Sequence, residues 1–82
     1  MNRFGDSVLI VAKMIVDSVP QDTIEFFLAV EPTLKHRNLS CVEMAQIYGT
    51  TPPAISHRVK LLTLKGYLNR IHYREWELVN KE

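Results

Sequence analysis

Several residue types and patterns on which whole classes of protein depend are scarce in this sequence. Its 82 residues include one cysteine and three glycines, and no apolar run reaches 18 residues. A single cysteine excludes an internal disulfide, and so few glycines can hardly build a glycine-rich phosphate-binding loop. Because a membrane-spanning helix needs about 20 predominantly apolar residues in a row, we expect none here and no membrane partner.

A secretory signal is not expected either. The apolar run 8–16 is interrupted by Lys13, and no small-residue cleavage site follows it. The lone Cys41 fits a reducing compartment. We therefore expect a cytoplasmic protein.

The sequence also lacks a recognisable catalytic or metal-binding set. His36, His57 and His72 fall on separate predicted elements, and no group of histidines and cysteines has the spacing of a zinc site. We therefore expect no enzyme, no metal and no cofactor. Cys41 follows Ser40 at a predicted helix N-terminus, which leaves open a redox-sensitive thiolate of lowered pKa. A small cysteine buried in the core is the more common alternative.

What remains is a short chain of ordinary globular composition, 46% hydrophobic and 23% charged. Its length predicts a single domain over residues 1–82. A chain of this size buries only about 60–65% of the surface that its unfolded form exposes, so a monomer would be marginally stable.

The charges are distributed unevenly along the chain, although the net charge is only +1. Residues 1–34 carry a net charge of −3, residues 35–74 carry +6, and residues 75–82 carry −2. A basic middle between acidic ends indicates a surface that binds a polyanion on one side of the molecule. The alternative is a chance cluster of solvated lysines and arginines.

The first predicted helix covers residues 6–17, with Asp6 or Ser7 as its N-cap. Only Lys13 and Asp17 interrupt an apolar surface that extends nearly all the way round. Such a helix must be buried on several sides, either at the centre of this small chain or against a second copy. A strand is an alternative for this segment, because it is rich in valine and isoleucine.

A second helix is predicted from Ser18 and Gln21, which have the spacing of a capping box, with Pro20 in the first turn. Its apolar face consists of Ile24, Phe27 and Leu28, flanked by Phe26 and Val30. The residue before a proline avoids helical geometry, so we expect Pro32 to end this helix and residues 31–38 to form a loop.

The second half of the chain predicts two short helices and a β-hairpin. One helix begins at a capping box of Ser40 and Glu43 and ends at Gly49, where a left-handed C-cap would lie. The next begins at the run 50–53, Thr-Thr-Pro-Pro, and continues to Lys65. After Gly66 the apolar period changes to two, which predicts strands at 67–71 and 76–79. The expected fold is mainly α with a small β-hairpin, in the α+β class.

Residues 39–79 resemble a winged helix-turn-helix domain of the broad kind found in MarR-like and ArsR-like transcription regulators. The helix-turn-helix spacing of a small residue, a turn glycine and a β-branched residue is met by Ala45, Gly49 and Ile55. The run 44–49, Met-Ala-Gln-Ile-Tyr-Gly, is similar to the family's leucine-alanine-x-x-leucine-glycine. The run 62–68 resembles the passage from recognition helix to wing.

This resemblance implies that the second short helix is a recognition helix, that the hairpin is a DNA-contacting wing and that Leu39 forms a short first strand. Residues 1–18 would be an extra N-terminal helix that could mediate dimerisation. Arg58 departs from the pattern, because the family usually has an apolar residue at this position of the recognition helix.

A Z-nucleic-acid-binding module is a related alternative. The pair 49–50, Gly-Thr, and the run 76–78, Trp-Glu-Leu, are similar to that family. Its asparagine and tyrosine, however, fall on Ser56 and Lys60 in this chain.

The expected recognition helix has two faces at helical spacing. Ile55, Val59 and Leu62 fall on one arc and should pack into the core. The opposite side carries groups that could contact base edges and phosphates in a major groove. These candidate residues are Pro53, Ser56, His57 and Lys60. We also expect free backbone N–H groups near Thr50 and Thr51 to favour a phosphate at the start of this helix.

The tip of the hairpin is basic and aromatic. Its candidate DNA-contacting residues are Arg70, His72, Tyr73 and Arg74. A basic hairpin tip can place an arginine in a narrow minor groove, and Arg74 is the strongest candidate. The alternatives are that these charges only protect a sheet edge, and that Tyr73 lies back on the hairpin.

These observations predict a sequence-specific transcription regulator that binds double-stranded DNA as a homodimer. A dimer is favoured by the apolar first helix and by Leu61 and Leu64, which lie away from the inward face of the recognition helix. The alternative function is a winged-helix module that binds other proteins and does not bind DNA.

Overall fold

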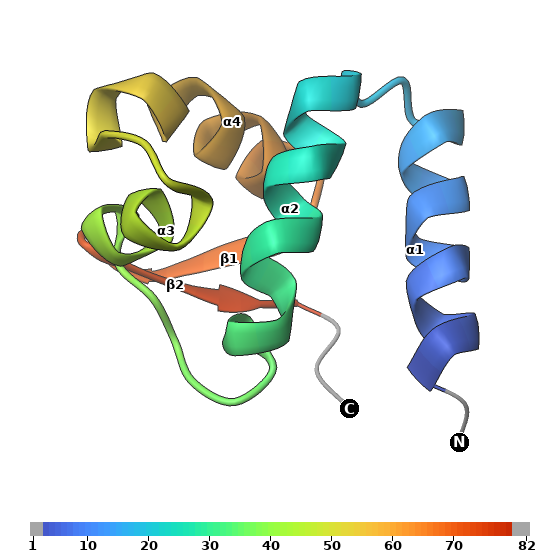
Figure 1. Ribbon diagram of the computed structural model, residues 1–82, viewed down its shortest axis with the longest axis horizontal. Coiled ribbons are helices and arrows are strands. Elements are labelled where there is room, and N and C mark those ends of the chain that lie inside the picture. The colour runs from blue at the N-terminus through green and yellow to red at the C-terminus, as the bar shows by residue number, and fades with distance from the viewer. Residues whose placement is uncertain (1–2, 80–82) are drawn as a thin grey trace.

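The computed structural model describes the backbone of residues 3–79 and the side chains of residues 9–79. Four helices precede a two-stranded antiparallel hairpin (Figure 1). The elements are α1 (Arg3–Val16), α2 (Gln21–Leu34), α3 (Cys41–Tyr48), α4 (Pro52–Leu64), β1 (Leu68–His72) and β2 (Glu75–Leu78). The predicted fold class, mainly α with a small C-terminal hairpin, is therefore confirmed, and the layout is consistent with a winged helix.

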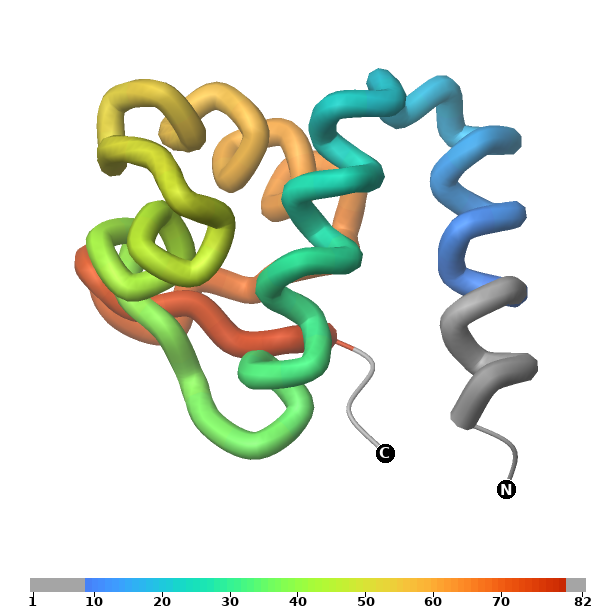
Figure 2. Tube along the Cα trace, in the orientation of Figure 1, coloured from blue at the N-terminus to red at the C-terminus, as the bar shows by residue number. Residues whose placement is uncertain are grey.

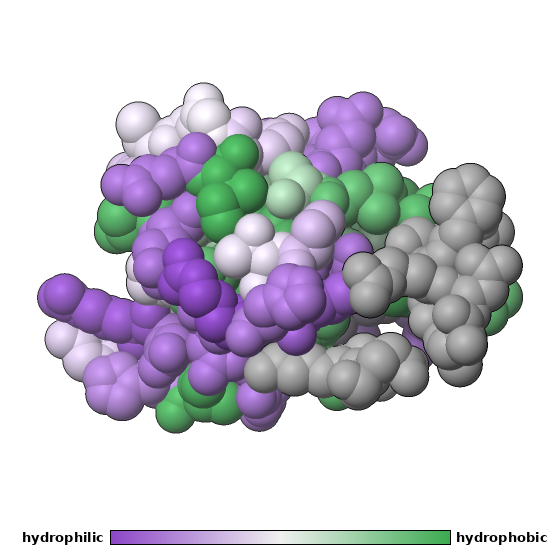
Figure 3. Space-filling model, turned by 60° about the horizontal axis from the view of Figure 1, so that its bottom comes forward, coloured by the Kyte–Doolittle hydropathy of each residue, from purple (hydrophilic) through white to green (hydrophobic). Residues whose placement is uncertain are grey.

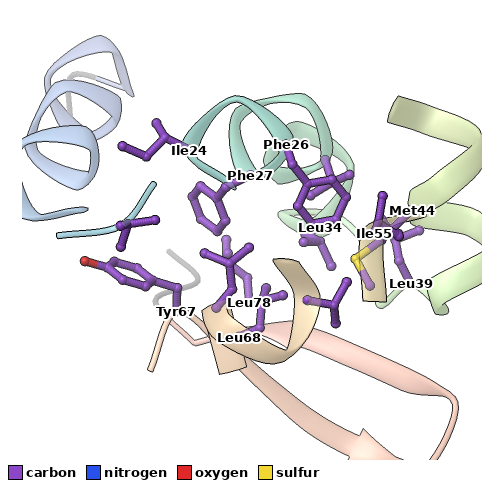
Figure 4. Packing of buried hydrophobic residues seen from close by; sticks show 14 of the residues in the cluster. Ile24, Phe26, Phe27, Leu34, Leu39, Met44, Ile55, Tyr67, Leu68 and Leu78 are labelled. Atoms are coloured by element: carbon purple, nitrogen blue, oxygen red, sulfur yellow. The ribbon is translucent and has the colours of Figure 1, made fainter. Parts of the chain in front are cut away.

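Helix α2 is the central element of the core. It lies with α1 on one side and with α3, α4 and the hairpin on the other (Figure 1). Its two adjacent phenylalanines point to different parts of the core, as Figure 4 shows. The Phe26 ring meets the Tyr48 ring edge-on at 5.4 Å, and the Phe27 ring meets the Tyr67 ring at 6.0 Å. One helix thus holds both the helix-turn-helix and the base of the hairpin.

The turn between α3 and α4 forms as the sequence predicts. The hydroxyl of Ser40 accepts from the N–H of Glu43 at 3.1 Å, and the Glu43 carboxylate accepts from the N–H of Ser40 at 2.9 Å. The bond from the Ser40 N–H, and a second that Arg37 donates to the same carboxylate at 2.9 Å, lower the pKa of Glu43. At the other end of α3, Gly49 adopts a left-handed conformation with φ of 89°. The predicted capping box and left-handed C-cap are therefore confirmed.

The hairpin pairs through its backbone with one further residue, Leu39. Leu68 pairs with Leu78 and Arg70 with Trp76, while the register is irregular between Arg70 and His72. Leu39 then pairs with Trp76 through two backbone hydrogen bonds of 3.1 and 2.8 Å. Leu39 is thus a single bridge beside β2, at the place that the resemblance gives to a short first strand.

The predicted boundaries between α1 and α2 are wrong. Helix α1 already includes Arg3, so Asp6 and Ser7 lie inside it. Ser18 does not cap α2, whose N-cap is Pro20 with no side-chain hydrogen bond. Ser18 instead ends α1 in a left-handed conformation with φ of 61°.

The hydrogen bonds at the end of α1 explain this outcome. The N–H of Val19 donates to Met14 and that of Ser18 donates to Ile15. This is a Schellman motif, which usually has a glycine at the left-handed position. The same pattern ends α4, where that position is Gly66 with φ of 90°.

Pro32 does not end α2, which continues to Leu34 with the proline inside its last turn. The extra turn buries Leu34 completely and allows Lys35 to form an ion pair with Glu31. Burial of Leu34 outweighs the hydrogen bond that a proline cannot donate. Leu28, expected on the buried face, is 40% exposed.

Helix α1 stands at the edge of the molecule beside α2, as the trace in Figure 2 shows for its C-terminal part. Met14 is fully buried and Ile10 and Val11 are partly buried against the core. Leu9 and Val16, in contrast, are 69% and 82% exposed. Of the two alternatives for this helix, a position at the centre of the chain is therefore wrong, because the described side chains of α1, residues 9–16, pack along one side only. None of the described helices is long and apolar enough to span a membrane.

Candidate nucleic-acid interface

Helix α4 has the two faces that its sequence predicts. Ile55, Val59 and Leu62 are buried in the core. Pro53, Ser56, His57 and Lys60 are all exposed on the other side. Three of these four carry a polar side chain, so the exposed face of α4 presents a hydroxyl, an imidazole and an ammonium group.

The start of α4 differs from the expectation for Thr50 and Thr51. Its first two residues are prolines, which have no N–H. The N–H of Ala54 donates to Thr51 at 3.0 Å, and that of Thr50 donates to Ala45 at 2.8 Å. The expected cluster of free backbone donors is therefore not formed by these residues. Thr51, the N-cap residue, makes no side-chain capping hydrogen bond, so its exposed hydroxyl is the donor left for a ligand.

The four candidate residues of the hairpin tip are all exposed. Arg70 donates to the carbonyl oxygen of Tyr73 at 2.8 Å and so braces the turn. The guanidinium of Arg74 lies 5.1 Å from the centre of the Tyr73 ring, and the rings of His72 and Tyr73 are 5.2 Å apart. Tyr73 is 62% exposed, so it stacks with its neighbours at the tip and is not buried against the hairpin.

Trp76 fixes the hairpin against α4, a role that the sequence reasoning missed. Its indole N–H donates to the hydroxyl of Thr63 at 3.2 Å, and that hydroxyl donates to Val59 at 2.8 Å. On the other strand, Arg70 lies 5.6 Å from the centre of the Trp76 ring. Trp76 therefore positions Arg70 relative to α4, and its being the only tryptophan of the chain was the available signal.

Arg58, the departure from the family pattern, is accommodated at the edge of the core. It forms an ion pair of 3.1 Å with Asp22 and lies 5.7 Å from the centre of the Tyr48 ring. It also donates to the carbonyl oxygen of Ala54 at 2.7 Å. Arg58 thus links α4 to α2 and α3, and its charge is compensated.

The basic residues of the segment 35–74 fall into two groups. Lys35, Arg37 and Arg58 pair with carboxylates at 2.9–3.2 Å. The second group has no carboxylate partner among the side chains of residues 9–79. One of its members, Lys65, lies between α4 and β1 and donates to the Asp17 carbonyl oxygen. The other three, Lys60, Arg70 and Arg74, lie exposed on α4 and the hairpin, so most of the uncompensated positive charge of the segment is found there.

The surface around the hairpin is correspondingly hydrophilic. Figure 3 brings the side of the molecule that carries the hairpin toward the viewer, and most of this face is hydrophilic with separate apolar patches.

Within the described residues no group of histidine, cysteine and acidic side chains could hold a metal ion. Burial raises the pKa of Cys41, which removes the alternative of a low-pKa thiolate at the start of α3.

Comparison of the chain with protein-family models, with curated proteins and with solved structures gave no match. The arguments for a function therefore come from the residues and their arrangement. The relevant arrangement is a helix with a polar outer face beside a basic hairpin, with uncompensated cations on both.

Proposed function

We propose that this protein is a transcription regulator that binds double-stranded DNA through α4 and the hairpin. The observation that carries this proposal is the division of the cations. Lys35, Arg37 and Arg58 of the basic segment are paired with carboxylates and Lys65 donates to the Asp17 carbonyl oxygen, whereas Lys60, Arg70 and Arg74 are exposed and have no carboxylate partner within the described part of the chain. Unpaired cations on one face suit the phosphates that supply most of the affinity for DNA.

The dimensions of α4 support its role as the element that reads sequence. Its thirteen residues give a length of about 20 Å, and a major groove about 12 Å wide admits a helix. We expect Ser56, His57 and Lys60 to contact base edges, with Pro53 and Thr51 beside the backbone. Lys60 donates to acceptors such as those of guanine, and His57 can donate or accept.

The hairpin supports a second kind of contact. Arg70 and Arg74 project from a tip that Trp76 anchors to α4, so both elements would reach one duplex together. An arginine in a narrow minor groove or on the phosphates strengthens binding and fixes the orientation of the protein. We expect the hairpin to contribute affinity on any duplex and α4 to contribute sequence preference.

We also propose that the working unit is a homodimer formed through α1. Leu9, Ile15 and Val16 are 64–82% exposed on one short helix. Burying such side chains stabilises by roughly 1.5–3 kcal/mol each, and a two-fold axis would bury the set in both copies. Two recognition helices about 34 Å apart would then read two half-sites, which raises specificity over a single domain. On this proposal the protein works in the cytoplasm.

A matched pair of variants tests the DNA proposal. Arg70→Ala and Arg37→Ala each remove one exposed arginine, but only Arg37 has a carboxylate partner, Glu43 at 2.9 Å. Fluorescence anisotropy with a random duplex at about 50 mM salt should show weaker binding for Arg70→Ala, by roughly tenfold, and little change for Arg37→Ala. Equal losses for both variants would mean that the α4–hairpin face is not the binding surface.

One observation favours a second candidate function. The exposed apolar side of α1 would also suit a different protein, so the chain could be a docking module that does not bind DNA. No binding of any duplex at micromolar protein and about 50 mM salt would favour this function over the first.

A further inference from the structure

A groove of about 460 Å³ lies between α4 and the hairpin. This volume is within the range of roughly 300–1,000 Å³ that is typical of small-molecule sites. The groove is held open by the anchor described above, in which the Trp76 indole N–H donates to Thr63. Both walls therefore belong to elements whose relative position is fixed.

The walls of the groove are chiefly apolar. Val59, Leu64 and Trp76 line them, and of these Leu64 is 81% exposed whereas Val59 is almost fully buried in the core. Cys41 contributes a thiol whose pKa is raised by burial, so it is neutral and behaves as an apolar group. The Thr63 hydroxyl is already used by two hydrogen bonds, to Trp76 and Val59. The apolar part of a ligand in this groove would thus contact apolar groups, because the hydroxyl of Thr63 is not available to it.

Two cations complete the lining. Lys60 comes from α4 and Arg70 from β1, so they approach the groove from its two sides. Neither has a carboxylate partner among the described side chains. Arg70 uses one donor on Tyr73, which leaves further N–H groups of its guanidinium available. The charge of the groove is therefore positive, and the complementary group is an anion.

We propose that this groove binds a small organic acid, whose apolar body packs on Leu64 and Trp76 while its anionic group pairs with Lys60 and Arg70. The same two cations are assigned above to DNA, so the acid and the duplex compete for them. This second part rests on the proposed function, whereas binding of the acid does not.

Three probes with the same eight-carbon chain test the charge requirement. Octanoate, 1-octanol and octylammonium have similar apolar chains and differ in the head group, which is anionic, neutral and cationic in turn. In an NMR titration of the full chain, octanoate should shift amides of α4 and the hairpin and should bind about tenfold more tightly than the other two. Lys60→Ala should weaken octanoate binding several-fold, and the paired control Arg37→Ala should leave it unchanged. Lys60 is exposed, so its replacement leaves the core intact.

Equal affinities for the three probes, or shifts confined to the apolar side of α1, would overturn the inference. Competition is measured separately, by adding octanoate to the complex with a labelled duplex. The duplex should be displaced in the concentration range that saturates the groove, and simultaneous binding of both would overturn the shared use of Lys60 and Arg70. Octanoate binding without DNA binding would support the inference and overturn the proposed function. DNA binding without octanoate binding would do the reverse.

Discussion

Helix α1 and the body formed by α2, α3, α4 and the hairpin are held together in very different ways. The body encloses Phe26, Phe27 and Leu62 almost completely, and three of its basic side chains pair with carboxylates while Lys60, Arg70 and Arg74 are exposed on α4 and the hairpin. Within the described side chains, α1 buries only Met14 fully and leaves several large apolar residues exposed. The two regions therefore serve different purposes, because the body completes a fold and α1 presents a surface.

Besides the apolar contacts of Met14, Ile10 and Val11 with the core, two hydrogen bonds at Asp17 join the two regions. The Tyr67 hydroxyl donates to the Asp17 carboxylate at 2.8 Å, and the Lys65 ammonium donates to the Asp17 carbonyl oxygen at 2.8 Å. Lys65 and Tyr67 both lie in the short segment between α4 and β1. The surface of the proposed dimer is thus joined to the end of the helix that we propose reads DNA.

We expect the largest change in the free energy of unfolding from a substitution in the core of the body. Leu62→Ala should lower the free energy of unfolding by about 2–5 kcal/mol, because Leu62 is fully buried among α4, α2 and the hairpin. Leu64→Ala makes the same change two residues away at an 81% exposed position and should alter it by less than about 0.5 kcal/mol. Urea denaturation measures both. Similar losses would mean that Leu64 is covered in solution.

A second prediction concerns the exposed side of α1. Ile15→Lys should convert a dimer of twice 9.5 kDa into a monomer in sedimentation equilibrium at about 100 μM, since it places a charge in the proposed interface. Val42→Lys, at an exposed position of α3, is the control and should remain dimeric, because α2 lies between α3 and α1 (Figure 1). A wild-type protein that is already monomeric at this concentration would contradict the dimer.

The smallest effect is expected at the junction. Tyr67→Phe removes one hydrogen bond to Asp17 and should lower the protection of the α1 amides in hydrogen exchange by about 1 kcal/mol, with little change for the amides of α4. Tyr73→Phe, at the exposed hairpin tip, is the control. Equal loss of protection in α1 and α4 would show that α1 is not separable from the body.

The same contact predicts a pH dependence. Burial and the Asp17 carboxylate raise the pKa of Tyr67 to about 12, above the ordinary value of about 10. A pKa raised by folding stabilises the native state fully below about pH 10, and this contribution is lost as the pH rises toward 12. The difference in stability between the wild type and Tyr67→Phe should therefore be constant up to about pH 10 and shrink above it.

The sequence predicted features that are encoded within a few residues. The capping box at Ser40 and the left-handed Gly49 are local, so the α3–α4 turn was predictable. The end of α1 was not, because a serine occupies the left-handed position at Ser18 where glycine is usual. Pro32 was misread because the burial of Leu34, a tertiary effect, extends α2 past the proline.

For the candidate site, too, the sequence predicted local features but not contacts between elements. Exposure of Lys60 and His57 followed from the helical spacing of their neighbours, which is local information. The pairing of Arg58 with Asp22 and of Arg37 with Glu43 depends on contacts between elements. The net charge of the segment 35–74 therefore overstated the positive charge that is free to meet a polyanion.

The salt dependence of binding to duplex DNA tests the central claim most directly, because it counts the phosphates that the protein neutralises. Three unpaired cations on the α4–hairpin face predict a slope of log K against log salt of about −3 for one chain and about −5 for a dimer with both copies engaged. The expected result is one of these slopes, reduced by about one unit per chain in Arg74→Ala. A slope near zero, or the same slope in Arg74→Ala as in the wild type, would contradict the account.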